Sequence, residues 1–221
     1  MEPRILTISR DRWVWGGTAL ACAAMLSAAD SQLRLFTGFA WFPVIVDVLV
    51  IAAIILFVRD AGEPRAMLAD RQAAWAGAAL IAIGVIGQTV WAQFIVLPPP
   101  AWFTAATFLF EAATLIGLAA LAWAVSRSRR IGRAYRNVIV AAVTAIIVSR
   151  VVELIVMSTP ILSPEFVNPT FWLITASAWT ITVFGMLAIA LAAVLAVHNE
   201  PTVDSPPIRE PKESHVISGI S

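Results

Sequence analysis

Six long apolar runs constrain this chain more than any other feature. They cover approximately residues 13–29, 41–58, 74–97, 102–125, 138–157 and 171–197. A helix rises 1.5 Å per residue and needs about 20 apolar residues to cross about 30 Å of hydrocarbon. Each run is near or above that length. We therefore predict an all-α, polytopic membrane protein with six transmembrane helices.

The composition agrees with a chain that faces lipid. Hydrophobic residues make up 60% of the 221 positions and charged residues only 13%, whereas about a quarter of the residues in a soluble domain are charged. The formal net charge is only +1, and no basic patch with interleaved aromatics is present. We expect the lipid bilayer as a partner and no nucleic acid.

The basic residues predict the orientation. Arg and Lys number fifteen, and thirteen of them fall on one side of the predicted spans: Arg4, Arg10, Arg12, Arg59, Arg65, Arg71, Arg127, Arg129, Arg130, Arg133, Arg136, Arg209 and Lys212. The opposite side has Arg34, and Arg150 lies within a run. The positive-inside rule then places both termini in the cytoplasm, and tryptophans near both ends of the runs are typical of interfacial belts. We expect a multi-pass protein of the cell membrane.

Two segments need a separate interpretation. The first run follows arginines and ends in Ser27-Ala28-Ala29, which is also the pattern of a signal peptide with a small-residue cleavage site. A retained helix is the reading we prefer, because the run is longer than a typical signal core and carries tryptophans. At the other end, residues 199–221 are rich in Pro, Glu and Ser and predict a disordered tail after a transmembrane domain of residues 1–198.

Several kinds of site are excluded by residue type. Cys22 is the only cysteine, so an intramolecular disulfide or a multi-cysteine metal site cannot form. His198 and His215 lie at or beyond the end of the last run, which excludes bis-histidine haem ligation within the membrane. The only lysine is Lys212, in the tail, which excludes a retinal Schiff base within the spans. No nucleotide-binding loop, metalloprotease motif or nucleophile turn occurs, and we predict neither a cofactor nor a metal.

Ionisable residues within membrane spans are costly and mark candidate functional sites. The number of residues between a side chain and the end of its span, multiplied by the helix rise, gives the depth of that side chain in the membrane. Asp47 and Glu153 are then about 10 Å deep, and Glu111, Arg150 and Gln88 are about 13–15 Å deep. All five fall in the half of the membrane opposite the arginine-rich side. We therefore predict one polar layer, formed by Asp47, Gln88, Glu111, Arg150 and Glu153, and add Trp179, which lies deeper than the other tryptophans, as a binding candidate.

Charge counting adds detail to this layer. Arg150 and Glu153 are three residues apart and share a helix face, so we expect them to pair. Three carboxylates and one guanidinium leave a net formal charge of minus two in a poorly solvated place. We expect Glu111 to be protonated or to bind a cation, which makes it the candidate proton donor. A purely structural Arg150–Glu153 pair that fixes helix register is the alternative for those two residues.

Residue spacing also predicts which helix faces are buried. Thr104, Thr107, Glu111 and Thr114 share an arc of about 80° and should face the bundle interior. Gly77, Gly84, Gln88 and Trp91 form one face of the third run, and Thr175, Trp179, Thr182 and Gly185 form one of the sixth. Small residues on such faces allow two helices to approach closely.

Three functions of different classes fit these features. The first is a small transporter or solute-binding membrane protein, because proton-coupled systems use buried carboxylates of this kind. The second is a membrane-embedded enzyme acting on a lipidic or prenyl substrate through protonation, a cyclase or isomerase with Glu111 as general acid. The third is an accessory subunit of a larger membrane complex or a homo-oligomer. The expected ligand is a small molecule or a lipidic substrate, and transport or ligand binding is the function that we favour.

Overall fold

The computed structural model describes the backbone of residues 3–37, 42–59, 61–62, 66–92, 101–158 and 169–198, and the side chains of residues 11–30, 43–59, 61–62, 66–91, 105–158 and 172–198. Every regular element in this part of the chain is an α-helix. The helices are α1 (Pro3–Thr37), α2 (Phe42–Val58), α3 (Arg71–Ala92), α4 (Ala101–Ser126), α5 (Arg133–Ser158) and α6 (Pro169–His198). The prediction of an all-α chain with a helix in each apolar run is confirmed.

The helix bounds differ from the apolar runs mainly at polar ends. α1 extends well beyond residues 13–29 in both directions, because no proline or glycine interrupts the chain between Gly17 and Thr37. The helix passes without a break through Ser27-Ala28-Ala29, where a signal-peptide cleavage site was the alternative. α5 begins at Arg133, five positions before the apolar run, because its first turn is polar but still helical. Apolar runs therefore locate helix centres better than helix ends.

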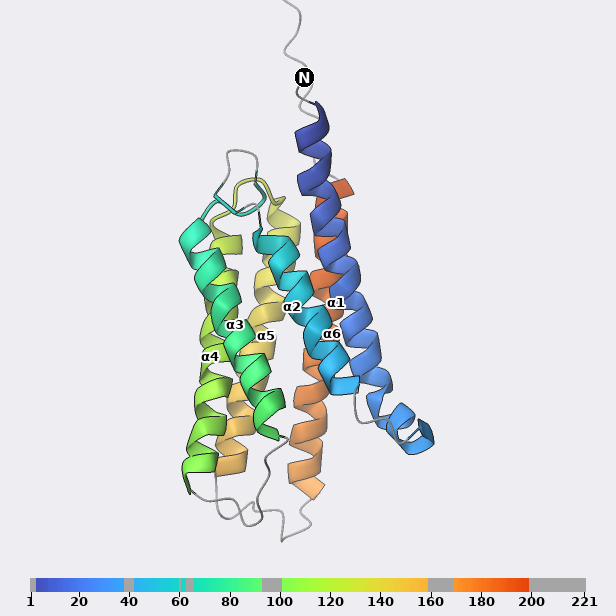
Figure 1. The fold of residues 1–221 in the computed structure, drawn as a ribbon, viewed down its shortest axis with the longest axis vertical. Helices are drawn as coiled ribbons and strands as arrows, with labels where there is room; N and C mark the ends of the chain where they lie inside the picture. Colours follow the sequence, from blue (N-terminus) through green and yellow to red (C-terminus); the bar gives the residue numbers. More distant parts are fainter. Residues whose placement is uncertain are drawn as a thin grey trace, which may run out of the picture.

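The six helices form a closed ring. Each helix packs against its neighbours in the chain, and α1 packs against α6 to complete the circle (Figure 1). The α3–α4 seam is the most extensive, and the α2–α3 and α4–α5 seams are the least extensive. Short connections join consecutive antiparallel helices, as in other up-and-down bundles. The ring leaves an interior that every helix can reach.

Glycines set the closest helix contacts. A Cβ atom added at Gly117 of α4 would lie 2.7 Å from the Gly77 carbonyl oxygen of α3, and one at Gly77 would lie 2.8 Å from the Gly117 oxygen. The same holds for α1, where Gly16 contacts the Phe57 ring of α2 and Gly17 contacts the Ala190 carbonyl of α6. α1 is thus held between α2 and α6 by two adjacent glycines. The prediction that glycine faces of the third and sixth runs allow close approach is confirmed for Gly77 and Gly84.

The arginine end of the bundle, where α2 meets α3 and α4 meets α5, is closed by packed loops. Ser128, in the loop after α4, is buried and its hydroxyl donates a hydrogen bond to the Met67 carbonyl in the loop after α2. Arg136 Nη1 donates to the Ser128 carbonyl at 2.9 Å, and Asp70 Oδ1 caps α3 by accepting from the Ala73 amide at 3.0 Å. Two loops distant in sequence therefore form one buried plug.

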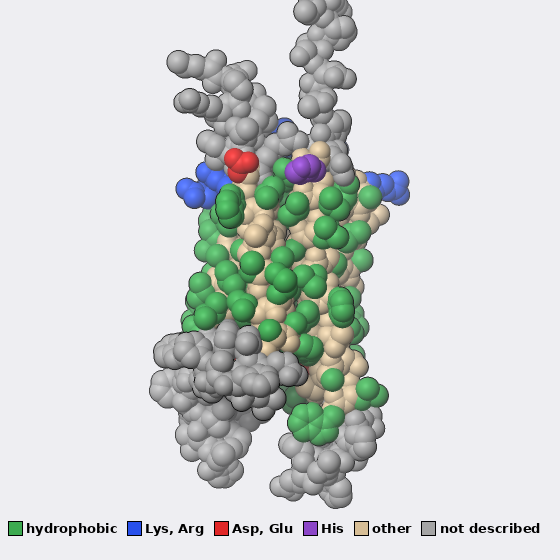
Figure 2. All heavy atoms as spheres, turned by 90° about the vertical axis from the view of Figure 1, so that its right-hand side faces the viewer, with side chains coloured by type: hydrophobic (Ala, Val, Ile, Leu, Met, Phe, Trp, Pro, Cys, Tyr) green, Lys and Arg blue, Asp and Glu red, His purple; other side chains and the backbone are tan. Residues whose placement is uncertain are grey.

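The surface of the ring fits a membrane. Four helical segments are long and apolar enough to cross one: Arg71–Trp91, Ala105–Ser126, Arg133–Ser158 and Trp172–His198. The described part of α2, Pro43–Val58, is a shorter apolar helix. Figure 2 shows one face of the molecule, on which the coloured charged and His side chains gather at one end and apolar side chains are spread over the described surface between the two ends. Large apolar residues such as Trp15, Leu109 and Phe184 are exposed on this outer surface, as expected where lipid replaces water.

Candidate functional site

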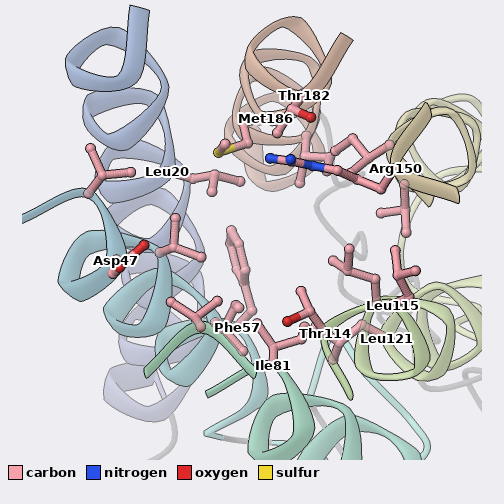
Figure 3. A pocket seen from close by; sticks show the side chains of 18 of the residues that line it. Leu20, Asp47, Phe57, Ile81, Thr114, Leu115, Leu121, Arg150, Thr182 and Met186 are labelled. Atoms are coloured by element: carbon pink, nitrogen blue, oxygen red, sulfur yellow. The ribbon is translucent and has the colours of Figure 1, made fainter. Parts of the chain in front are cut away.

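The interior of the ring contains an elongated cavity of about 370 Å³. All six helices contribute to its lining, and Figure 3 shows their side chains converging on it, with Leu20, Phe57 and Ile81 among them. Its lining extends along α6 from Trp179 to Ala193, which corresponds to about 21 Å at 1.5 Å per residue. The volume lies near the lower end of the range of small-molecule sites, about 300–1,000 Å³. The cavity is consequently long and narrow.

One end of the cavity is polar. Asp47, Gln88, Glu111 and Arg150 line it there, together with Trp179. Five of the six predicted site residues thus meet in one cavity although they come from five different helices. Glu153 is the exception, because it pairs with Arg150 without lining the cavity.

α3 connects the carboxylates of two neighbouring helices. Gln88 Nε2 donates a hydrogen bond to Glu111 Oε2 on α4, and the next residue, Thr89, donates through its hydroxyl to Asp47 Oδ2 on α2. Both carboxylates therefore accept a hydrogen bond from a neutral donor. Thr89 was not among the predicted site residues, because a single threonine carries no signal in an apolar run.

Arg150 approaches the cavity from the opposite wall. Its Nη1 lies 3.0 Å from Glu153 Oε2, one turn further along α5, which places the expected intrahelical pair in the structure. The side chain of Arg150 is 36% exposed and that of Glu153 only 14%. Figure 3 shows the Arg150 guanidinium extending into the cavity near Met186, with Asp47 on the other side. A ligand in the cavity would meet a paired guanidinium on one wall and carboxylates on the other.

The remainder of the cavity is apolar and closed at the arginine end. Its lining there includes Trp13, Leu68, Val125, Ile139 and Ala193, all of them buried. Trp13 also packs on Phe57 with ring centroids 5.1 Å apart. The lining residues of the polar end are less buried than these. The apolar part is therefore a blind pocket, and the polar part is the less enclosed of the two.

α1 adds to the site two polar residues that were not among the predicted site residues. Ser27 and Asp30 line the cavity on the same face as Trp13 and Leu20. The predicted first span ends at residue 29, one position before Asp30. The seven-residue spacing of Trp13, Leu20 and Ser27 was the available signal, since such spacing keeps residues on one helix face. Only the continuation of α1 to Thr37 makes Asp30 an interior residue.

The threonines of the predicted faces have a structural role. Thr114 and Thr182 line the cavity, but each hydroxyl donates to a carbonyl of its own helix, at 3.1 Å to Phe110 and 2.8 Å to Ala178. The Thr175 hydroxyl is buried without a hydrogen-bond partner among the described residues. The side chain of Thr104 is not among those that the structure describes. Thr114 and Thr182 therefore face the interior as predicted, and their hydrogen bonds stay within their own helices. Thr107, from the same predicted face as Thr114, is instead exposed and does not line the cavity.

No group of three or more His, Cys, Asp or Glu residues in the described part of the chain is arranged to hold a metal ion. Comparison of the chain with protein-family models, curated proteins and solved structures finds no match. The function must therefore be argued from the cavity itself.

Proposed function

We propose that this chain is a six-span membrane protein with both termini in the cytoplasm, which binds a small amphiphilic molecule in its central cavity and carries it as a transporter or solute-binding protein. The observation that carries the proposal is the cavity, whose lining is apolar and buried toward the arginine end and polar and less buried at the other. A strictly hydrophilic solute would leave its polar groups unsatisfied in the apolar part. A fully apolar molecule would leave Asp47, Glu111 and Arg150 without a partner from the ligand.

The six-span topology rests on packing and charge. α1 and α2 complete the ring around the cavity, and Ala23, Ala24 and Ala53 are fully buried in their contacts. Removing α1, as signal cleavage would, exposes these surfaces and opens one wall. The arginines around the α2–α3 and α4–α5 connections lie at helix ends or in loops, on the side that the positive-inside rule assigns to the cytoplasm: Arg59, Arg71, Arg127, Arg129, Arg130, Arg133 and Arg136.

The topology can be tested with single cysteines. Replacing Cys22 by Ala leaves a chain without cysteine, into which Arg129→Cys introduces one exposed thiol at the arginine end. We expect a membrane-impermeant maleimide to label it in inverted vesicles and not in intact cells. The reverse pattern would overturn the proposed orientation.

Ligand binding can be tested by filling the cavity. Val143 of α5 is buried and lines the cavity, whereas Val148 of the same helix is exposed on the outer surface. The two valines allow a matched pair of variants, Val143→Phe and Val148→Phe. With radiolabelled dodecyl compounds as probes, we expect saturable binding to the wild type and Val148→Phe, and loss of binding in Val143→Phe. Equal binding by all three proteins, or none by the wild type, would refute the proposal.

Catalysis on a lipidic substrate is the second candidate. The apolar lining next to Glu111 and Trp179 favours it, because a carboxylic acid can protonate a carbon–carbon double bond of a polyprenyl chain, and an aromatic face can stabilise the resulting carbocation. Conversion of an added polyprenyl substrate by purified protein, abolished by Glu111→Gln, would decide for the enzyme. Flux into proteoliposomes without chemical change would decide for transport.

A further inference from the structure

We infer that the ligand of the central cavity is an amphiphilic organic cation, with one positively charged head group at the polar end and one slender apolar chain in the blind pocket. This inference rests on the proposed function and specifies its substrate class. Three independent features of the cavity support it: its shape, its charge balance and a tryptophan in the lining at a depth similar to that of Glu111.

The shape limits the apolar part of the ligand. A volume of about 370 Å³ spread over about 21 Å fits one extended hydrocarbon chain. The blind end, at Leu68 and Ala193, is lined by buried apolar residues without a charged group. A hydrocarbon chain meets no unsatisfied polar atom there, and each buried CH₂ group contributes about 0.8 kcal/mol.

The charge balance selects the head group. Glu153 neutralises Arg150 at 3.0 Å, so the guanidinium adds no net positive charge to the polar end. Asp47 and Glu111 receive hydrogen bonds from the neutral Thr89 and Gln88, which leaves their formal charge uncompensated by those donors. A surplus of carboxylates in a poorly solvated place attracts a cation and repels an anion.

Trp179 supplies the third feature. It lines the cavity about 15 Å from the start of α6, and Glu111 lies about 15 Å from the start of α4, so the two residues are at a similar depth. Tryptophan is the ring that interacts most strongly with organic cations, and quaternary ammonium groups are bound in this way. Carboxylates and a tryptophan around one end of an apolar pocket together form a receptor for an alkylammonium ion.

The test uses four probes that share a dodecyl chain and differ in the head group: dodecyltrimethylammonium, dodecylphosphocholine, dodecanol and dodecanoate. Binding to the full-length protein in an uncharged amphipol is measured against Val143→Phe as the blocked reference. We expect dodecyltrimethylammonium to bind about tenfold or more tightly than dodecanol, and dodecanoate to bind most weakly. Glu111→Gln should remove most of the preference, while Asp11→Asn, an exposed change of the same charge at the arginine end, should leave it intact.

The outcomes separate the two proposals. Binding in the cavity is binding that Val143→Phe abolishes. If dodecanol or dodecanoate binds in the cavity as tightly as the ammonium probe does, the cation inference is wrong and the proposed function stands. If no probe binds in the cavity, the proposed function itself fails. Trp179→Leu gives an independent check, because it should weaken the trimethylammonium probe more than dodecanol. Equal weakening of both would remove the tryptophan from head-group recognition.

Discussion

The glycine contacts between α3 and α4 lead to a quantitative prediction for Gly84→Ala. A Cβ atom at this position would lie 2.6 Å from the Phe110 carbonyl oxygen and 2.9 Å from the Thr114 amide nitrogen, and it would also overlap the Thr114 hydroxyl. Contacts of Cβ atoms below 3.0 Å are essentially absent from real structures. Because two of these neighbours are backbone atoms of α4, rotation of a side chain cannot relieve the clash, and the helices must separate.

Two opposing effects determine the magnitude. Alanine is favoured over glycine within a helix by about 0.5–1 kcal/mol. Overpacking a well-packed contact costs about 1–3 kcal/mol. We therefore expect Gly84→Ala to lower the free energy of unfolding by about 1–2 kcal/mol, although the substitution improves helix propensity.

Two other glycines provide graded controls. A Cβ atom at Gly185 would lie 2.8 Å from Cδ1 and Cγ1 of Ile146, a side chain that can move, and at an ordinary 3.6 Å from the Ala142 carbonyl oxygen. One at Gly132 would lie 3.3 Å from the Tyr135 ring in an exposed loop, so Gly132→Ala should change stability by no more than about 0.5 kcal/mol. The order of destabilisation should be Gly84→Ala, then Gly185→Ala, then Gly132→Ala.

Equilibrium unfolding in mixed micelles, followed by tryptophan fluorescence, measures these differences. Adding Thr114→Ala to Gly84→Ala should recover only part of the loss, because the Phe110 carbonyl remains in place. A Gly84→Ala protein as stable as wild type, or a full recovery in the double variant, would refute the close approach of α3 and α4.

Three further predictions concern polar and backbone features. Ser128→Ala should destabilise the protein by about 1–3 kcal/mol in the same unfolding assay, because it leaves the buried Met67 carbonyl without its donor; an unchanged stability would argue against the loop plug. Arg150→Leu should destabilise the protein more than the double variant Arg150→Leu/Glu153→Leu does. A double-mutant cycle should give a coupling free energy of about 0.5–3 kcal/mol between the two side chains, and a coupling of zero would contradict the ion pair. Gly62→Ala should destabilise by about 1–2 kcal/mol, because its φ of 85° strains an alanine and the Cβ atom would lie 2.6 Å from Arg71 Cβ; a stabilised variant would refute this backbone conformation.

The sequence by itself determined the class of the protein and its helices. Apolar runs of sufficient length must pair their backbone groups internally in lipid, and a helix does this without help from other segments. The same local rules placed Arg150 and Glu153 on one face, and they placed glycines on the face of α3 that contacts α4. Such features depend on the helix period and rise alone, so no knowledge of the fold is needed to find them.

Depth along the membrane could also be read from the sequence, but position around the ring could not. The depths grouped Asp47, Gln88, Glu111 and Arg150, because helix rise converts residue number into height, and these four residues line one cavity in the structure. They could not show that Glu153, at nearly the same height, does not line the cavity, or that Asp30 does. Those facts depend on how each helix is rotated about its axis and on where α1 ends.

Only the tertiary structure decided that the interior is a narrow cavity with one polar and one closed end. The contact between α1 and α6 closes the ring, and it depends on Gly17 meeting a carbonyl of a helix more than 150 positions away. The plug formed by Ser128 and Met67 likewise joins two loops that carry no individual motif. Shape arises from contacts between distant segments, and no local pattern in the sequence encodes which of them meet.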